Sequence, residues 1–594
     1  MSEESRLKPY KSLLLARLAA GVRVAGSVDS ILGDVEELVR ARPNLSVMER
    51  HGQVRTGELY AGHLRYLERR PVTWTSEDIV DRIHHLIVVC RRRSHVAIFA
   101  SDTGLRSVLA RHFGDPESHE GLGSLARVDA SVLNAVFVRG PTRTLWLSGT
   151  HRRTSVKADG KVLSGVDLRD ALDPLDDQTY FFSAARSKLD FSSTPVGVSP
   201  RRSSLWAGTS ADWTDFRDTV ARALAELDGE IAPDNAPLPV LAVPTTDPGA
   251  VADAFDVGLQ APELLSGDPT DDAATREDAE RWGYGAVFDV IETAGPDFRC
   301  DLRLHDTHLG TLSVAVDVSD AHRVRCTVTA EPASEATRAD LEEARERCSR
   351  RSWITVRYDS GHTVSDGVVY ETRFRDVSFS GFRWAELGDV DRHREKPPDL
   401  NETGLHQSLF DWVARQWPNL DGTTARPGGW LACDDGSMEI ADFIHLDEST
   451  DLPTLSLIHV KAAKTNDPGR EISVAAYEVV VAQAVKNLRH LDRSALAAGL
   501  EAGIQKEVGD LVWHDHEESD RDAMIAALSA LGTNYRRQLV ILQPQVTQSR
   551  HESARSGSSP RDQQRLRQLD LLLLGADADA HALAATFVVL GDAV

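Results

Sequence analysis

The sequence predicts a mixed α/β protein of several domains. Its 594 residues would fill about three to four domains at about 150 residues each. They are 41% hydrophobic and 27% charged, as in folded globular chains. Some stretches alternate between apolar and polar residues with period two, and others repeat with helical spacing. We therefore expect an N-terminal α/β region over residues 1–235, a β-rich middle domain over 250–395 and an α/β domain over 396–594.

The N-terminal region combines helical and strand patterns. Residues 1–75 are predicted to be largely helical, because Leu13–Leu15, Ile31 and Val35 recur near helical spacing. A helix is expected over 215–227, before a linker with several Pro at 229–250. Short apolar runs separated by Gly and Pro predict strands at 86–90, 95–99, 135–138 and 144–147. Residues 1–395 carry no motif that indicates a reaction, and we expect them to recognise a target or a partner.

The middle domain is predicted from alternating residues. Period-two alternation recurs before and after a charged helix expected over 334–350, and Lys396-Pro397-Pro398 marks the end of the domain. The alternating segments are 302–304, 312–316, 324–328 and 354–356. The pattern predicts a sheet interrupted by one helix.

Composition limits the function classes. The chain has no apolar run of about 18 residues, so we expect no membrane span. Its acidic, polar start argues against a secretory signal, and five scattered cysteines suit a reducing cytoplasm. The formal charge of −24 is unusual for a nucleic-acid binder, but it leaves room for a local basic groove. The chain also lacks the P-loop motif of nucleotide hydrolases.

Lysine is scarce in this chain. Only ten of the 67 basic residues are Lys, and three of them are Lys461, Lys464 and Lys486. Lysine is a compact charge that changes protonation when buried, which Arg does not do. The cluster therefore indicates a chemical role, and the alternative is chance clustering on a solvated surface.

The C-terminal domain begins with a predicted helix. Leu405, Leu409, Val413 and Trp417 form an i, i+4 stripe, so we expect an amphipathic helix over 403–417. Asp411 falls on the solvent side of this helix. Glu402 lies beside the stripe, where its carboxylate could face a site.

Three strands should follow this helix. Trp430–Cys433 predicts the first strand, Asp434–Ser437 a tight turn, Glu439–Leu446 the second strand and Leu455–Lys461 the third. Asp442 would share an apolar face of the second strand with Ile440 and Ile444. A carboxylate on an apolar face is costly unless something such as a metal ion binds it. His459 and Lys461 would project from one face of the third strand.

A helix is expected over 474–489, with Tyr477, Val480 and Ala484 on its apolar side. Gln483 and Lys486 fall on the polar side, and Glu478 lies at the border. This polar side is either a solvated surface or one wall of the site. The remaining segments are expected to be a helix at 521–531, a strand at 538–542, a polar loop at 547–560, a helix at 562–574 and an apolar end at 582–590.

This order of a helix, a hairpin with Asp442, a strand ending in His459-Val460-Lys461 and a further helix resembles the restriction-endonuclease-like, or PD-(D/E)XK, nuclease superfamily. The segments Asp435–Asp442, Tyr477–Lys486 and Val540–Pro544 also resemble a nuclease-like segment found after helicases and in bacterial anti-phage or DNA-processing proteins. The resemblance covers residues 400–594, about a third of the chain. It implies an α/β nuclease fold.

The resemblance assigns Asp442 as the metal-binding carboxylate and Lys461 as the catalytic lysine. The residue two positions before this lysine is usually Glu, Asp or Gln in the superfamily, whereas this chain has His459. A neutral imidazole is a poor ligand for Mg²⁺ and suits Mn²⁺ better. His459 would act as a ligand or a proton shuttle, and Glu439, Asp435 or Glu402 would supply a second carboxylate.

The resemblance implies a cytoplasmic endonuclease that uses Mg²⁺ or Mn²⁺ to cleave DNA, or RNA, in bacterial anti-phage defence. The alternative is a non-catalytic subunit whose degenerate nuclease fold recruits nucleic acid, a partner helicase or another defence subunit. Both readings leave the oligomeric state and the trigger open.

Overall fold

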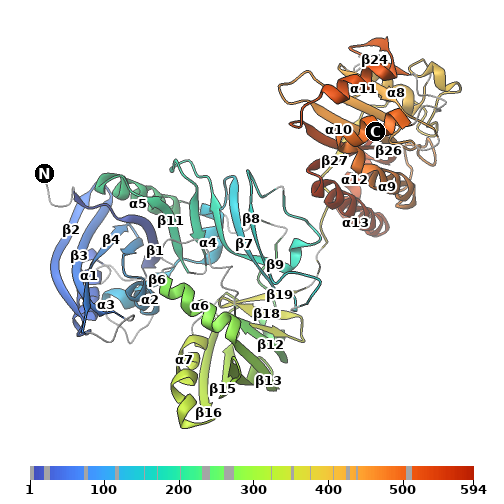
Figure 1. Cartoon of the computed structure of the whole chain (residues 1–594). Helices are drawn as coiled ribbons and strands as arrows, with labels where there is room; N and C mark the ends of the chain where they lie inside the picture. Colours follow the sequence, from blue (N-terminus) through green and yellow to red (C-terminus); the bar gives the residue numbers. More distant parts are fainter. Residues whose placement is uncertain are drawn as a thin grey trace. The chain divides into compact units, whose positions relative to one another are not determined.

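The computed structural model forms two compact units, residues 1–172 with 176–374 and residues 173–175 with 375–594 (Figure 1). The mixed α/β class predicted from the sequence is confirmed. Within the described residues, no helix is both long enough and apolar enough to cross a membrane. The structure describes residues 6–18, 27–72, 78–113, 120–152, 154–169, 171–200, 202–229, 238, 241–259, 273–322, 324–349, 354–372, 374, 376–405, 407–422, 428–436, 439–502 and 511–594.

An eleven-stranded sheet forms most of the first unit, with the strand order β2-β3-β4-β5-β1-β11-β10-β9-β7-β8 and β6 paired with β1. Its strands are β1 (Tyr10–Leu18), β2 (Leu45–Thr56), β3 (Leu59–Pro71), β4 (Val80–Arg92), β5 (His95–Ala100), β6 (Leu125–Arg127), β7 (Thr142–Gly149), β8 (Gly160–Ser164), β9 (Tyr180–Ser187), β10 (Val196–Ser199) and β11 (Ser204–Thr209). The helices of this region are α1 (Val28–Arg40), α2 (Thr103–Arg111), α3 (Glu120–Gly123), α4 (Ala130–Phe137) and α5 (Trp213–Leu227).

The prediction that residues 1–75 are largely helical is wrong. Only α1 is an α-helix in the described part of this stretch, and β1, β2 and β3 form the rest of its regular structure. Leu13 and Leu15 pack into one core with α5, whereas Leu14 packs into another with α1. A strand buried on both faces is apolar at every position, so its sequence lacks the period-two alternation of a half-buried strand.

Two four-stranded sheets complete the first unit. Their orders are β12-β17-β18-β19 and β13-β14-β15-β16, with every neighbouring pair antiparallel. This confirms the predicted strands near residues 302, 314, 326 and 355. The elements are β12 (Ala254–Leu259), α6 (Ala273–Gly285), β13 (Ala286–Ala294), β14 (Asp297–Leu304), β15 (Thr307–Asp317), β16 (Arg325–Pro332), α7 (Arg338–Cys348), β17 (Ile354–Tyr358), β18 (His362–Ser365) and β19 (Val368–Glu371).

An eight-stranded sheet of order β20-β27-β26-β23-β22-β21-β24-β25 is the centre of the second unit. Strands β20, β27, β26 and β23 are parallel, and the strands from β23 to β25 are antiparallel. The strands are β20 (Phe382–Ala385), β21 (Trp430–Cys433), β22 (Phe443–Asp447), β23 (Thr454–Val460), β24 (Val512–His514), β25 (Glu517–Ser519), β26 (Arg536–Thr547) and β27 (Ala585–Asp592). The helices are α8 (Leu409–Gln416), α9 (Ala475–Asn487), α10 (Arg493–Ala502), α11 (Arg521–Ala530), α12 (Gln548–Arg555) and α13 (Pro560–Ala582). This unit includes residues 376–395, although the sequence predicts a boundary at Lys396.

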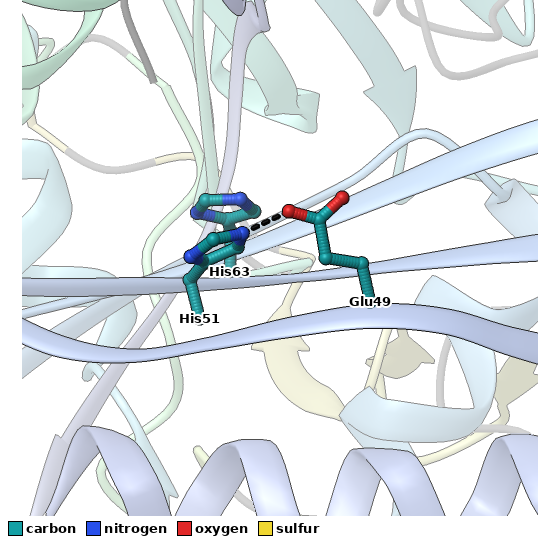
Figure 2. Close-up of side chains that lie close together, drawn as sticks. All are labelled: Glu49, His51 and His63. Carbon is teal, nitrogen blue, oxygen red and sulfur yellow. Dashed lines mark hydrogen bonds and ion pairs between the residues drawn. The ribbon is translucent and has the colours of Figure 1, made fainter. Parts of the chain in front are cut away.

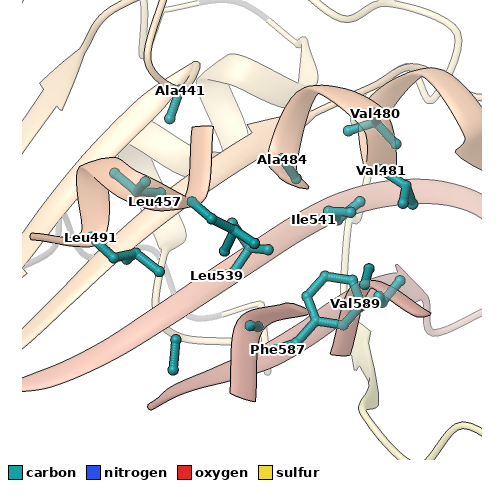
Figure 3. Packing of buried hydrophobic residues seen from close by; sticks show 14 of the residues in the cluster. Ala441, Leu457, Val480, Val481, Ala484, Leu491, Leu539, Ile541, Phe587 and Val589 are labelled. Carbon is teal, nitrogen blue, oxygen red and sulfur yellow. The ribbon is translucent and has the colours of Figure 1, made fainter. Parts of the chain in front are cut away.

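Hydrophobic residues cover both faces of this sheet. Leu457 and Leu539 face a core built with α9, α10, α11 and α13, whereas Ile458 and Val540 face a core built with α8. Figure 3 shows the side chains of α9 packed against β26 and β27 in the larger core. The alternation of strand side chains between the two cores fixes which face of β22 and β23 each polar residue occupies.

Three expectations about the segments near the candidate site need correction. The predicted helix over 403–417 begins only at Leu409, and Leu405 is 72% exposed. The predicted strand over 439–446 begins at Phe443, which leaves Glu439 in a loop. The polar loop predicted over 547–560 contains α12.

Asp411 is buried, so the prediction that it faces solvent is wrong. Its Oδ2 atom accepts hydrogen bonds from the Ser408 backbone N–H at 2.9 Å and from Ser408 Oγ at 2.5 Å, and its Oδ1 accepts the Gly404 N–H at 2.6 Å. Ser408 Oγ in turn accepts the Asp411 N–H, which completes a capping box at the start of α8. This box explains why the helix starts at Leu409 and not at residue 403.

We expect Asp411→Ala to lower the free energy of unfolding by about 2 kcal/mol, because the helix loses its cap and buried donors lose their acceptor. Urea unfolding followed by circular dichroism measures the change. Asp451→Ala, at an exposed loop position, is the control and should be neutral. Equal stability of the two variants would contradict this role of Asp411.

Candidate functional site

Three carboxylates converge at the junction of β21 and β22. One oxygen from each of Asp435, Glu439 and Asp442 lies within 4.8 Å of the others. Asp435 and Asp442 are buried, and Glu439 is half-buried. Three anionic groups this close repel one another, so the arrangement favours bound protons or cations.

The loop between β21 and β22 is held by Asp434, which lies outside this group of three. Its Oδ1 accepts a hydrogen bond from Arg521 Nη2 at 2.8 Å, and its Oδ2 accepts the Ile440 N–H at 3.1 Å. Gly436 has φ +144°, a backbone conformation that a side chain would strain, and its N–H donates to Glu439 Oε2 at 3.2 Å. Ser437 and Met438 of the predicted turn lie outside the described residues.

Asp442 connects the loop to the neighbouring strand. Its Oδ2 accepts the Val460 N–H at 2.7 Å, where β22 and β23 pair through Phe443 and Ile458. Burial raises the pKa of Asp442 well above its usual value, and the nearby charge of Glu439 adds to this effect. Asp442 is therefore a desolvated carboxylate at the end of the strand pair that also leads to Lys461.

Two lysines form ion pairs with carboxylates in this region. Lys461 follows β23 directly, and its Nζ lies 2.8 Å from Glu395 Oε2. Lys396 Nζ lies 2.5 Å from Asp435 Oδ1. Although burial lowers the pKa of Lys396, its hydrogen bond to Asp435 and the surrounding carboxylates raise it overall. Each lysine is thus paired with a carboxylate of the site.

Glu395 and Lys396 are site residues that the sequence analysis missed. The charge of Glu395 raises the pKa of Asp442, which locates Glu395 near the cluster. Arg392 anchors the same segment, because its Nε donates to Asp592 Oδ2 of β27 at 3.1 Å. The available signal was the scarcity of lysine, since Lys396 is a fourth member of the small set that includes Lys461, Lys464 and Lys486.

Helix α9 forms one side of the site. Gln483 Nε2 donates to Glu439 Oε1 at 3.5 Å, and Asn487 Nδ2 donates to the Glu439 backbone O at 3.3 Å. Lys486 is exposed on the same helix, and Glu478 is exposed in its first turn. The structure thus brings Gln483 to the carboxylates and leaves Glu478 in solvent.

His459 is buried beneath α9 at 1% exposure. Burial lowers its pKa to about 3, and the charge of Lys486 acts in the same direction. Its Nε2 has no hydrogen-bond partner within the described residues, and His459 is not part of the group of three carboxylates. Glu402 also lies outside that group, in an exposed 3-10 turn (Leu400–Glu402).

The donor set fits a hard divalent cation. Mg²⁺ and Mn²⁺ bind carboxylate oxygens, and Asp435, Glu439 and Asp442 offer such oxygens at one place. Glu439 also has a raised pKa, caused first by burial and then by the charge of Asp435. A cation bound here would relieve the repulsion among the three groups.

Comparisons with protein-family models, curated proteins and solved structures found no match for this chain.

We expect Asp442→Asn to be more stable than the parent protein at pH 7 in EDTA. Folding raises the pKa of this carboxyl, so the native state holds its proton more tightly than the unfolded state does. Stability of the parent should therefore fall as the pH rises above the unfolded value of about 3.9. The advantage of Asp442→Asn should disappear below that pH in urea unfolding measured across a pH series.

Asp434→Asn is the matched control for this experiment. Its side chain is buried and pairs with Arg521, so its replacement should destabilise the protein at pH 7. A stability difference between Asp442→Asn and the parent that stays constant with pH would contradict the proposed repulsion.

We expect Mg²⁺ or Mn²⁺ to raise the melting temperature of the parent protein. A ligand that binds only the native state stabilises it by about 2.7 kcal/mol at about 100 times its dissociation constant. Asp435→Asn should reduce this shift, and Asp451→Ala should keep it. Differential scanning fluorimetry with and without EDTA provides the readout, and equal shifts in all three proteins would argue against a metal at this cluster.

Proposed function

We propose that the second unit is a metal-dependent nuclease domain of the restriction-endonuclease-like kind, which cleaves phosphodiester bonds of DNA in bacterial anti-phage defence. The observation that carries this proposal is the convergence of Asp435, Glu439 and Asp442 beside β23, the strand that Lys461 directly follows. The order β21, β22, β23 and α9 also matches the order of elements that the superfamily resemblance implies.

Phosphodiester hydrolysis forms a bond between a water oxygen and phosphorus while the bond to the leaving oxygen breaks. A divalent cation held by Asp435, Glu439 and Asp442 would supply Lewis-acid stabilisation of the phosphate charge. Lys461 is partly exposed, so its ammonium group can offset the negative charge that develops on the phosphate and orient the water. Glu395, 2.8 Å from Lys461 Nζ, positions that ammonium group.

The local distribution of charge also supports a nucleic-acid substrate. The chain carries a formal charge of −24 and would repel a phosphate backbone in general. Three of its ten lysines, residues 396, 461 and 486, nevertheless come from the segments that form the site. A local group of cations gives a phosphate backbone a place to approach.

Two observations favour the alternative, a non-catalytic binding subunit. The site has His459 where the superfamily usually has Glu, Asp or Gln, and this imidazole is buried and neutral. In addition, Lys396 and Lys461 already pair with Asp435 and Glu395. These two ion pairs offset part of the negative charge of the site without a metal ion.

We expect the purified full chain to cleave plasmid or single-stranded DNA with Mg²⁺ or Mn²⁺ and to stop with EDTA. Asp442→Ala and Lys461→Ala should reduce the cleavage rate by at least about 100-fold, the loss typical of removing one group that stabilises a transition state. Both should keep DNA binding in a gel-shift assay. Lys464→Ala is the control, because Lys464 Nζ hydrogen-bonds Ser473 at 2.9 Å, away from the carboxylates.

Phage plaque counts distinguish the two functions. If the protein is a nuclease, cells that produce a stable Lys461→Ala protein should lose protection against phage, whereas cells that produce Lys464→Ala should keep it. If it is a non-catalytic binding subunit, both variants should protect the cells against phage. Full protection by Lys461→Ala, with an unchanged melting temperature, would exclude catalysis at this site.

A further inference from the structure

The first unit contains a second group of metal-ligating side chains, far along the sequence from the carboxylates described above. Glu49, His51 and His63 each offer one ligand atom, and these atoms lie within 4.8 Å of one another. Figure 2 shows the two imidazole rings stacked, with a ring nitrogen of each turned toward the Glu49 carboxylate. The ring centroids are 4.5 Å apart.

The pairing of β2 with β3 builds this group. His51 lies directly opposite His63, and Glu49 lies opposite Arg65. The register shifts on both sides of the Glu49–His51 segment, between Val47 and Glu49 and between His51 and Val54. Irregularities of this kind re-aim side chains at the edge of a sheet, and β2 is the outermost strand at this end.

The buried side chain of His63 has an unpartnered nitrogen, as expected if it binds a cation. It is 3% exposed, and its Nδ1 is buried with no hydrogen-bond partner among the residues that the structure describes. Its ring stacks on the His51 ring and contacts the Trp213 ring edge-on, with 6.2 Å between the ring centroids. An unpartnered imidazole nitrogen can donate its lone pair to a cation.

Arg65 orients the carboxylate of this group. Arg65 Nη1 donates to Glu49 Oε2 at 2.9 Å, and Glu49 Oε1 is the oxygen that contacts His51 Nε2. A partner that holds one carboxylate oxygen and directs the other toward the ligands is a common arrangement around protein-bound metals. Arg65 therefore pairs with Glu49 Oε2 and leaves Glu49 Oε1, the oxygen beside His51, for a cation.

We propose that Glu49, His51 and His63 bind one Zn²⁺ ion. Two imidazole nitrogens and one carboxylate oxygen suit Zn²⁺, whereas Mg²⁺ and Ca²⁺ prefer oxygen ligands alone. The side chains of His51 and Glu49 are 36% and 27% exposed, so solvent reaches the ion and supplies its remaining ligand. The ion links the edge strand β2 to β3.

Equilibrium dialysis of the metal-free full chain against ZnCl₂ tests this site. The parent protein should bind one more equivalent of Zn²⁺ than His51→Ala and Glu49→Gln, which alter partly exposed side chains and leave the carboxylates of the second unit intact. His84→Ala, on the exposed side of β4, is the matched control and should bind as much Zn²⁺ as the parent. Zn²⁺ should also raise the melting temperature of the parent more than that of His51→Ala.

Substitution with Co²⁺ provides a spectroscopic check, because the visible absorption of Co²⁺ reports its ligands. Loss of this absorption in both His51→Ala and Glu49→Gln, with melting temperatures in EDTA equal to the parent value, supports the site. Equal Zn²⁺ stoichiometry in the parent, His51→Ala and Glu49→Gln would overturn it. Nuclease activity enters none of these measurements, so their outcome is separate from that of the proposed function.

Discussion

The hydrogen bond from the Val460 N–H to Asp442 Oδ2 joins the carboxylate cluster of the C-terminal site to the end of β23. It fixes a buried carboxylate at the point where β22 and β23 begin to separate. Desolvation makes the ionised form of Asp442 costly, and the neighbouring carboxylates increase this cost. Positive charge accompanies these carboxylates, because Lys396 pairs with Asp435 and Lys461 pairs with the neighbouring Glu395. A bound divalent cation would meet the same requirement more completely.

The sequence was most informative about this region where local patterns decide the structure. Apolar runs and turn residues predicted β21, β23 and α9. The prediction that Asp442 shares a strand face with Ile440 and Ile444 is wrong, because β22 begins at Phe443 and Asp442 lies just before it. Glu395 and Lys396 were missed because their partners lie far along the chain, Asp435 being 39 residues after Lys396. Such ion pairs depend on the tertiary fold, and the spacing of residues in the sequence does not reveal them. The assignment of these residues to catalysis stays a prediction.

In the N-terminal region, the local sequence pattern itself was ambiguous. Three consecutive leucines at 13–15 are compatible with a helix or with a strand that is buried on both faces, and the structure has the strand. The same error concealed the group formed by Glu49, His51 and His63. His51 and His63 are unremarkable when they are twelve residues apart in a helix, but they face each other across two antiparallel strands.

The anchor between Arg392 and Asp592 has a consequence for biosynthesis. The two residues are 200 positions apart, and Asp592 is 1% exposed where Arg470 also binds it, at 2.6 Å. Strand β27 also separates β20 from β26 in the sheet. While the ribosome is still translating the residues before β27, the segment that carries Glu395 has neither its strand neighbour nor its anchor. The segment that carries Glu395 and Lys396 therefore gains its anchor and its strand neighbour only after this late strand has left the ribosome.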